Sequence, residues 1–193
     1  MKELIGEVEL LNRTTGIFDP AYVFQELDEK SFDDFEKLWR PMLVAQRTPD
    51  SHWEWVEKAR EVAKLTQYET FSVECDGTTQ GLMFVNLMKF AQIVEQKGRE
   101  LVYIELLATA PWNRPKVDAS PRYKGVGRIL IGTAISLSRD MEFSGRIALH
   151  SLTDSESWYR DEAGFTDLGL DTKKKMRYFE MTEAQATAFL SAQ

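Results

Sequence analysis

The chain has 193 residues, a length typical of one domain, and 43% of them are hydrophobic, which is enough for a packed core. Its net charge of −7, from 24 Lys and Arg against 31 Asp and Glu, argues against a general nucleic-acid-binding surface, which needs a basic stripe. There is no apolar run of about 18 residues and no signal-peptide pattern at the start, and Cys75 is the single cysteine. These features predict a cytoplasmic protein without a membrane span or an internal disulfide.

The first third of the chain predicts a strand followed by two helices. In chain order the pattern gives a strand, a turn-rich break and two helices, at residues 2–11, 14–20, 31–46 and 49–65. Ser31 is the expected N-cap of the first helix, because its hydroxyl can accept a hydrogen bond from the first turn. Pro41 is expected to end or kink that helix, since proline has no backbone N–H to donate.

From residue 68 the hydrophobic period changes to two, which is typical of strands. Strands are predicted at residues 68–75, 80–88, 101–108, 146–152 and 175–181, and helices at residues 126–141, 154–162 and 182–190. Asp76-Gly77 is a strong signal for a tight hairpin turn between the first two of these strands. The order of elements predicts one α/β domain, with antiparallel hairpins first and a strand–helix–strand crossover later.

A glycine-rich segment separates a predicted strand from a predicted helix: Arg122-Tyr123-Lys124-Gly125-Val126-Gly127, here called the glycine loop. Glycines let the backbone approach a ligand closely, and a helix N-terminus offers unpaired N–H groups and a positive dipole end. Further cations, Arg114, Lys116 and Arg128, lie nearby in the sequence. The segment therefore predicts a phosphate site, although tight packing of a helix on a sheet is an alternative reason for the glycines.

The neighbourhood of the glycine loop shares several stretches with a known family. They are the strand Tyr103-Ile104-Glu105-Leu106-Leu107-Ala108-Thr109, the later strand Ile147-Ala148-Leu149-His150, and Trp158-Tyr159 before Gly164-Phe165. With the glycine loop they resemble the GNAT superfamily of N-acetyltransferases. The resemblance implies an α/β (α+β) fold with a mixed, mostly antiparallel central sheet flanked by helices and splayed fourth and fifth strands. It implies one domain over residues 1–193, with an N-terminal strand and acceptor-side helices (1–67), a cofactor-binding core (68–181) and a C-terminal helix (182–193).

The resemblance also implies acetyl-CoA as the donor of an acetyl group. Backbone N–H groups and cationic side chains of the glycine loop and its neighbour would hold the pyrophosphate, and the backbone near the end of the fourth strand would bond the pantetheine. The residues expected to bind the cofactor are Arg122, Tyr123, Lys124, Gly125, Val126, Gly127 and Arg128 in the loop, and Leu107, Ala108 and Thr109 in the strand. No metal site is expected, since one cysteine and two distant histidines do not form one.

Transfer of an acetyl group to an amine needs a base for the amine proton and an acid for the departing thiolate. Tyr159 matches the tyrosine acid of the family, although four residues separate it from Gly164 where the family usually has three. Glu105 is one candidate base, because the family often has a carboxylate on this strand. His150 is another, with a suitable ordinary pKa. Each has a structural alternative: a core aromatic, a solvent-facing charge and a structural hydrogen-bonding group.

The segment between the fourth strand and the glycine loop is longer than in typical family members. Three prolines stiffen residues 111–121, and we expect this segment to fold over the cofactor or the acceptor as a partial lid. The acceptor would be a small amine, a peptide N-terminus or a lysine, with no nucleic acid or membrane as partner and a homodimer as a possibility of the family. The rival interpretation is a non-catalytic GNAT-like protein that binds CoA or acts through protein contacts.

Overall fold

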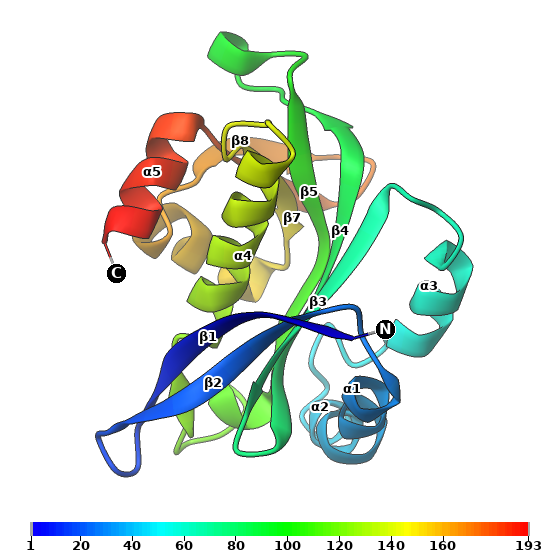
Figure 1. Ribbon diagram of the computed structural model, residues 1–193, viewed down its shortest axis with the longest axis vertical. Helices are drawn as coiled ribbons and strands as arrows, with labels where there is room; N and C mark the ends of the chain where they lie inside the picture. The colour runs from blue at the N-terminus through cyan, green and yellow to red at the C-terminus, as the bar shows by residue number, and fades with distance from the viewer. Residues whose placement is uncertain (1, 193) are drawn as a thin grey trace. The chain divides into compact units, whose positions relative to one another are not determined.

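The computed structural model describes residues 2–192 (Figure 1). Their strands form one mixed, mostly antiparallel sheet in the order β6-β1-β2-β3-β4-β5-β7-β9-β8, with β5 and β7 as a parallel pair. The chain divides into two compact units, each described by itself: the chain up to Phe84 with Leu106–Leu130, and Val85–Glu105 with the chain from Ile131 onward. None of the helices in the described residues has both the length and the hydropathy that crossing a membrane requires.

The strands of the first unit pair in antiparallel fashion. They are β1 (Glu3–Asn12), β2 (Phe18–Gln25), β3 (Tyr68–Cys75), the start of β4 (Thr78–Phe90) and β6 (Tyr123–Lys124). The predicted strands at 2–11, 68–75 and 80–88 are confirmed, but β2 begins inside the segment predicted as a turn-rich break. Pro20 lies in β2, and a proline argues locally against a strand. Pairing with β1 overrides that local signal.

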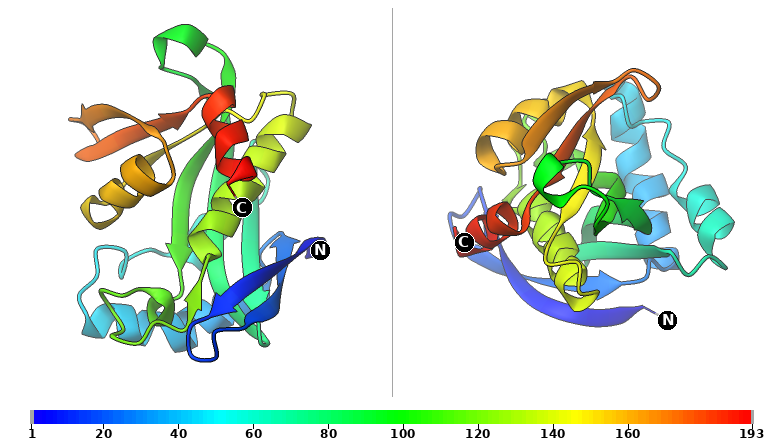
Figure 2. Two further views of the ribbon diagram at one scale, coloured as in Figure 1. Left: turned by 90° about the vertical axis from the view of Figure 1, so that its left-hand side faces the viewer. Right: turned by 90° about the horizontal axis from the view of Figure 1, so that it is seen from above.

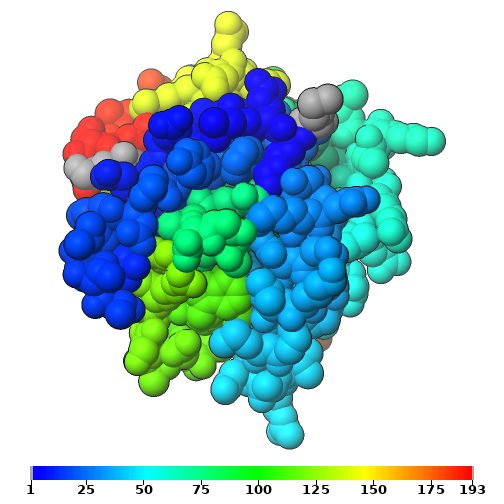
Figure 3. Space-filling model, turned by 60° about the horizontal axis from the view of Figure 1, so that its bottom comes forward, coloured from blue at the N-terminus to red at the C-terminus, as the bar shows by residue number. Residues whose placement is uncertain are grey.

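The predicted hairpin turn between β3 and β4 is confirmed. Asp76 and Gly77 both have positive φ angles, 52° and 66°, as the two-residue hairpin turn requires. The next connection of importance leads from β5 (Glu100–Thr109) through a turn at Pro111–Asn113 to β6 and then to α4 (Val126–Asp140). Figure 3 views the molecule from the side where the β3–β4 turn lies beside the loop that precedes α4.

The first predicted helix consists of three successive parts: α1 (Glu29–Asp34), a π-helical turn (Phe35–Trp39) and α2 (Arg40–Ala45). The prediction of Ser31 as N-cap is wrong, because Asp28 is the cap and its carboxylate accepts the N–H of Ser31 at 2.9 Å. Pro41 does not end the helix: it comes just after the π-helical turn, and the helical backbone continues to Ala45. The second helix, α3 (Trp55–Val62), begins later than the predicted start at residue 49.

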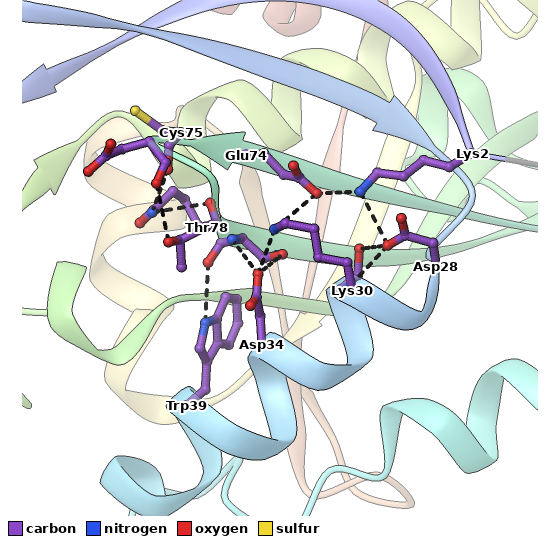
Figure 4. A network of polar contacts seen from close by, with 12 residues as sticks. Lys2, Asp28, Lys30, Asp34, Trp39, Glu74, Cys75 and Thr78 are labelled. Atoms are coloured by element: carbon purple, nitrogen blue, oxygen red, sulfur yellow. Dashed lines mark hydrogen bonds and ion pairs between the residues drawn. The ribbon is translucent and has the colours of Figure 1, made fainter.

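A network of charged side chains fastens α1 to the strands of this unit (Figure 4). Lys2 contacts both Asp28 and Glu74, and Lys30 contacts Asp34 at 2.8 Å and Glu74 at 3.5 Å. Beneath it, aromatic rings of the helices pack on β4, among them Phe35, Trp39, Trp55 and Phe84. Apolar side chains of these helices, packed on β4, therefore form a core cluster of the first unit.

The second unit contains the remaining strands and the closing helix. They are the ends of β4 and β5, β7 (Ile147–Ser151), β8 (Thr166–Asp171), β9 (Met176–Met181) and α5 (Glu183–Ser191). The prediction missed β8, whose pairing with β9 shifts register between Asp167 and Leu170, next to Gly169 with φ 92°. The closing helix is confirmed and has a complete capping box, Thr182 with Gln185. Figure 2 shows α5 beside the C-terminal part of α4, where Arg139 donates to Thr187 at 2.9 Å.

Candidate functional site

The glycine loop leads directly into the N-terminus of α4. Gly125 has a φ of +112°, which residues with a side chain rarely adopt, and α4 begins at Val126. The first in-helix bond from this turn is the N–H of Ile129 to the carbonyl of Gly125, at 2.9 Å. The N–H groups of Val126 and Gly127 precede that bond, and a helix offers no carbonyl to the N–H groups of its first turn. They form the donor set that an anion at a helix N-terminus uses.

Close packing fixes this helix start on the sheet of the first unit. A Cβ atom placed on Gly81 of β4 would lie only 2.6 Å from Cγ1 of Val126, so glycine is required there. A Cβ on Gly127 would lie 3.9 Å from Cγ2 of Thr109, at the end of β5. The fold thus brings together two segments that the sequence predicted for the cofactor, Leu107–Thr109 and the glycine loop.

The first residues of the loop are already bonded within the chain. The N–H of Arg122 donates to the carbonyl of Trp112 at 2.9 Å, and the N–H of Tyr123 donates to Oδ1 of Asn113 at 2.9 Å. Lys124 pairs with Leu11 of β1. The helix start at Val126 therefore lies just beyond the part of the loop that these bonds hold.

The cations near the loop differ in their surroundings. Arg122 donates to Asp76 at 2.5 Å and lies over the ring of Tyr123, at 5.1 Å. Arg114 forms an ion pair with Asp50 at 2.7 Å, and Asp50 is only 4% exposed. Lys124 is exposed. Arg122 and Arg114 are thus paired with carboxylates, and of these three side chains Lys124 adds the most positive charge near the helix start.

The parallel ladder between β5 and β7 is short. It joins Val102 to Ile147, Tyr103 to Ala148 and Ile104 to Leu149, whereas β5 continues to Thr109. The last five residues of β5 therefore lie beyond the last pair of this ladder. An early end of the pairing between β5 and β7 agrees with the splayed fourth and fifth strands that the resemblance implies.

Glu105, one candidate base, lies in the second unit at the first position beyond that ladder. It is partly buried, and its Oε1 accepts a hydrogen bond from Nδ2 of Asn86 at 3.2 Å. Glu105 faces the same side of β5 as Tyr103, two residues earlier. The pKa of Tyr103 is raised mainly by burial and further by the negative charge of Glu105.

His150, the other candidate base, has both ring nitrogens bonded. Nδ1 lies 2.6 Å from the hydroxyl of Tyr103, and Nε2 lies 3.1 Å from Oδ2 of Asp171. Because the carboxylate of Asp171 can only accept, the neutral imidazole carries its proton on Nε2, and Nδ1 accepts from the hydroxyl of Tyr103, whose oxygen also accepts from Lys174 at 2.8 Å. Burial, followed by the charge of Lys174, lowers the pKa of His150. No sequence pattern indicated this cluster, because its members come from β5, β7, the end of β8 and the β8–β9 turn.

Tyr159, the candidate acid, lies in a π-helical turn, Trp158–Glu162. It is 7% exposed and packs between the rings of Phe165 and Phe179. Burial raises the pKa of Tyr159 far above its usual value, so the hydroxyl stays protonated at neutral pH. A π-helical turn contains one residue more than an α-helical turn. This wide turn therefore accommodates the fourth residue between Tyr159 and Gly164, where the family usually has three. The carbonyl of Tyr159 still accepts the N–H of Phe165, at 2.9 Å.

Within residues 2–192 no group of three or more His, Cys, Asp or Glu side chains could hold a metal ion. The donors gathered at the start of α4 are instead N–H groups and cations, which fit a phosphate-bearing molecule. Sequence reasoning missed two residues that organise this site, Gln80 and Asn113. Both are uncharged amides without a motif, and only the fold brings them to the loop.

No protein-family model matches the chain, and no curated protein sequence matches it. Solved structures do. The spermidine/spermine N-acetyltransferase SpeG from Vibrio cholerae, in mutant forms, is similar with a TM-score of 0.52 and 15% identity over 86% of this chain and 96% of that chain. A bacterial toxin is similar with a TM-score of 0.54 and 10% identity, covering 74% and 85% of the two chains. A transcriptional regulator from Bacillus halodurans has a TM-score of 0.51 and 16% identity, covering 75% and 93%.

These similarities concern the fold, since the identities are low. The order of strands, the parallel pair β5–β7 in an otherwise mostly antiparallel sheet, and the helix that follows the glycine loop agree with them. The chain therefore has the GNAT-like fold that its sequence resembles.

Proposed function

We propose that the protein is an N-acetyltransferase that moves an acetyl group from acetyl-CoA to a primary amine. The observation that carries the proposal is the start of α4, where the first N–H groups of a helix, two glycines and nearby cations meet the end of β5. An acetyltransferase from Vibrio cholerae with the same fold supports the reaction type.

The donor would be held by the first unit. The N–H groups of residues 126–128 bind the pyrophosphate, with Lys124 and Arg128 adding positive charge. The backbone of Leu107–Thr109 bonds the pantetheine as an added strand would. Acetyl-CoA supplies an activated thioester, and all other steps fall to the chain and the amine.

In the transfer the amine nitrogen attacks the thioester carbonyl carbon, so a C–N bond forms and the C–S bond breaks. Glu105 takes the proton that the amine loses, and Tyr159 gives a proton to the departing sulfur, which leaves as the free thiol. We favour Glu105 over His150 as the base, because the single acceptor nitrogen of the neutral His150 ring already accepts from Tyr103, whereas a carboxylate has two oxygens that can each accept more than once.

Two measurements on the intact protein test the proposal. Acetyl-CoA should raise the Tm, because a ligand that binds only the folded state stabilises it. Release of free thiol should then appear with some members of a panel of amines that includes polyamines, peptides with free N-termini and lysine. A higher Tm without thiol release for any amine would favour the non-catalytic interpretation, and an unchanged Tm at millimolar acetyl-CoA would contradict the donor site.

A further inference from the structure

Gln80 of β4 is a fully buried polar residue whose hydrogen bonds lead toward the glycine loop. Its side-chain oxygen accepts from Nε1 of Trp112 at 2.9 Å and from Nδ2 of Asn113 at 2.9 Å. Its amide nitrogen donates to two carbonyl oxygens of the β3–β4 turn, those of Cys75 and Thr78, each at 3.3 Å. Since every polar atom of the side chain is used, its orientation is fixed.

Asn113 extends these bonds to the loop itself. Its Nδ2 donates to Gln80, and its Oδ1 accepts the N–H of Tyr123 at 2.9 Å. The neighbouring carbonyl of Trp112 accepts the N–H of Arg122, also at 2.9 Å. Asn113 therefore links a fixed side chain in the sheet to the residues immediately before Gly125.

The base of the long connecting segment is also fixed from the other side. Nε of Arg114 donates to the carbonyl of Thr109 at 2.7 Å, and its Nη1 pairs with the buried carboxylate of Asp50 at 2.7 Å. The N–H of Ala110 donates to the carbonyl of Gln80 at 2.8 Å. Residues 110–114 are thus held at both ends, independently of the outer part of the segment.

We infer that Asn113, supported by Gln80, is a positioning residue that orders the glycine loop for the cofactor phosphates. A segment with two glycines has much conformational freedom to lose, and a loop ordered in advance loses less of it on binding. The inference rests on the proposed donor site. It concerns the base of the segment and differs from the lid predicted for residues 111–121, which depends on the outer part.

Hydrogen exchange in the free protein tests the ordering directly. In Asn113→Ala the amide of Tyr123 loses its acceptor, so exchange of a peptide covering residues 122–128 should become faster. Asn113→Leu removes the same bonds but preserves volume, and serves if the alanine variant does not fold. Trp112→Phe is the matched control, since it removes the other hydrogen bond to Gln80 and leaves the bond from Asn113 to Tyr123. It should lower the Tm without faster exchange at residues 122–128.

Binding and kinetics test the consequence. In the Asn113 variants the Kd and the KM for acetyl-CoA should rise about three- to tenfold, as loss of one buried hydrogen bond allows, while kcat at saturation stays within about twofold. Equal effects of Trp112→Phe and Asn113→Ala on Kd, or unchanged exchange at residues 122–128, would overturn the inference. If the wild type itself does not bind acetyl-CoA, the proposed function fails, and the exchange measurement alone still decides whether Asn113 orders the loop.

Discussion

At the scale of single residues, a substitution of Tyr159 can distinguish a catalytic role of this side chain from a structural one. Its ring fills space between Phe165 and Phe179, and in the described part of the chain its hydroxyl has no hydrogen-bond partner. Tyr159→Phe should therefore change the Tm very little, while kcat falls about a hundredfold and the KM for acetyl-CoA stays the same, because the proposed proton donor is lost. Steady-state kinetics and thermal unfolding measure the two effects.

Tyr178→Phe provides the matched control for that substitution. Tyr178 is also buried, but its hydroxyl donates to Glu180 at 3.1 Å. Its loss should lower the Tm modestly, because one of several hydrogen bonds to the buried Glu180 carboxylate is removed, and should leave kcat unchanged. A wild-type kcat for Tyr159→Phe would remove the tyrosine from the mechanism.

His150 makes the stability of the second unit depend on pH. Its pKa is lowered in the folded state, by burial and then by Lys174, so the unfolded chain binds a proton more readily. The stabilisation from neutral His150 is complete above about pH 6.5, the usual histidine pKa, and is lost as the pH falls from there through the folded pKa. The Tm advantage of the wild type over His150→Gln should shrink as the pH falls from about 7.5 to about 5.

The other histidine, His52, is exposed, so His52→Gln is a suitable control. It should lower the Tm by the same small amount at every pH in that range. A Tm difference between wild type and His150→Gln that stays constant with pH would show that the bonds of His150 to Tyr103 and Asp171 do not depend on its charge.

At the scale of elements, the contact between β4 and α4 depends on one glycine. A methyl group at Gly81 would meet Val126 at 2.6 Å and Leu130 at 3.0 Å, so the helix start must move. Gly81→Ala should cost about 1–3 kcal/mol of the free energy of unfolding, as overpacking does, and should weaken acetyl-CoA binding. Gly6→Ala is the control, because its nearest atom would lie at an ordinary 3.8 Å. Equal losses from both substitutions would contradict this account.

The π-helical turn that carries Tyr159 yields a second prediction about an element. Deleting the exposed Asp161 leaves three residues between Tyr159 and Gly164, the spacing usual in the family, and should convert the wide turn into an α-helical one. The variant should fold, keep Tyr159 packed against Phe165 and retain most of its kcat. Circular dichroism and steady-state kinetics measure this. A kcat as low as that of Tyr159→Phe would mean that the wide turn itself sets the position of the hydroxyl.

At the scale of the whole molecule, the sequence was informative wherever local pattern decides structure. It predicted β3, the turn at Asp76-Gly77, β5, α4 and α5, since periodicity and turn chemistry are local. It missed β2, where Pro20 argues against a strand, and β6, whose two residues become a strand only by pairing with Leu11 and Asn12.

The same limit applies to the candidate site. The glycine loop has a recognisable motif, but the groups that hold it do not. Asn113 precedes its partner Tyr123 by ten positions, and Gln80 precedes Asn113 by 33. The two hydrogen-bond partners of His150, Tyr103 and Asp171, likewise come from separate strands. Contacts of this kind are created by the tertiary structure. An asparagine or glutamine in a single sequence carries no local pattern that predicts them.

Charge is the property of the whole chain that bears most on cofactor binding. A protein with a net charge of −7 repels an anionic ligand at long range, whereas cations near α4 attract it at short range. Lys124 is exposed at the loop, so its attraction should be screened by salt. Lys124→Gln should weaken acetyl-CoA binding about two- to fivefold at low salt, as expected for one exposed charge near a helix N-terminus.

The salt dependence distinguishes a local charge from a general one. Between about 0.1 M and 1 M NaCl the screening length falls from about 10 Å to about 3 Å, so the difference in Kd between wild type and Lys124→Gln should shrink. Lys173→Gln removes the same charge from the exposed turn between β8 and β9 and leaves the loop intact. It should change the Kd little at any salt concentration. If both substitutions weaken binding equally, the net charge of the molecule, and not the position of Lys124, governs the attraction of acetyl-CoA.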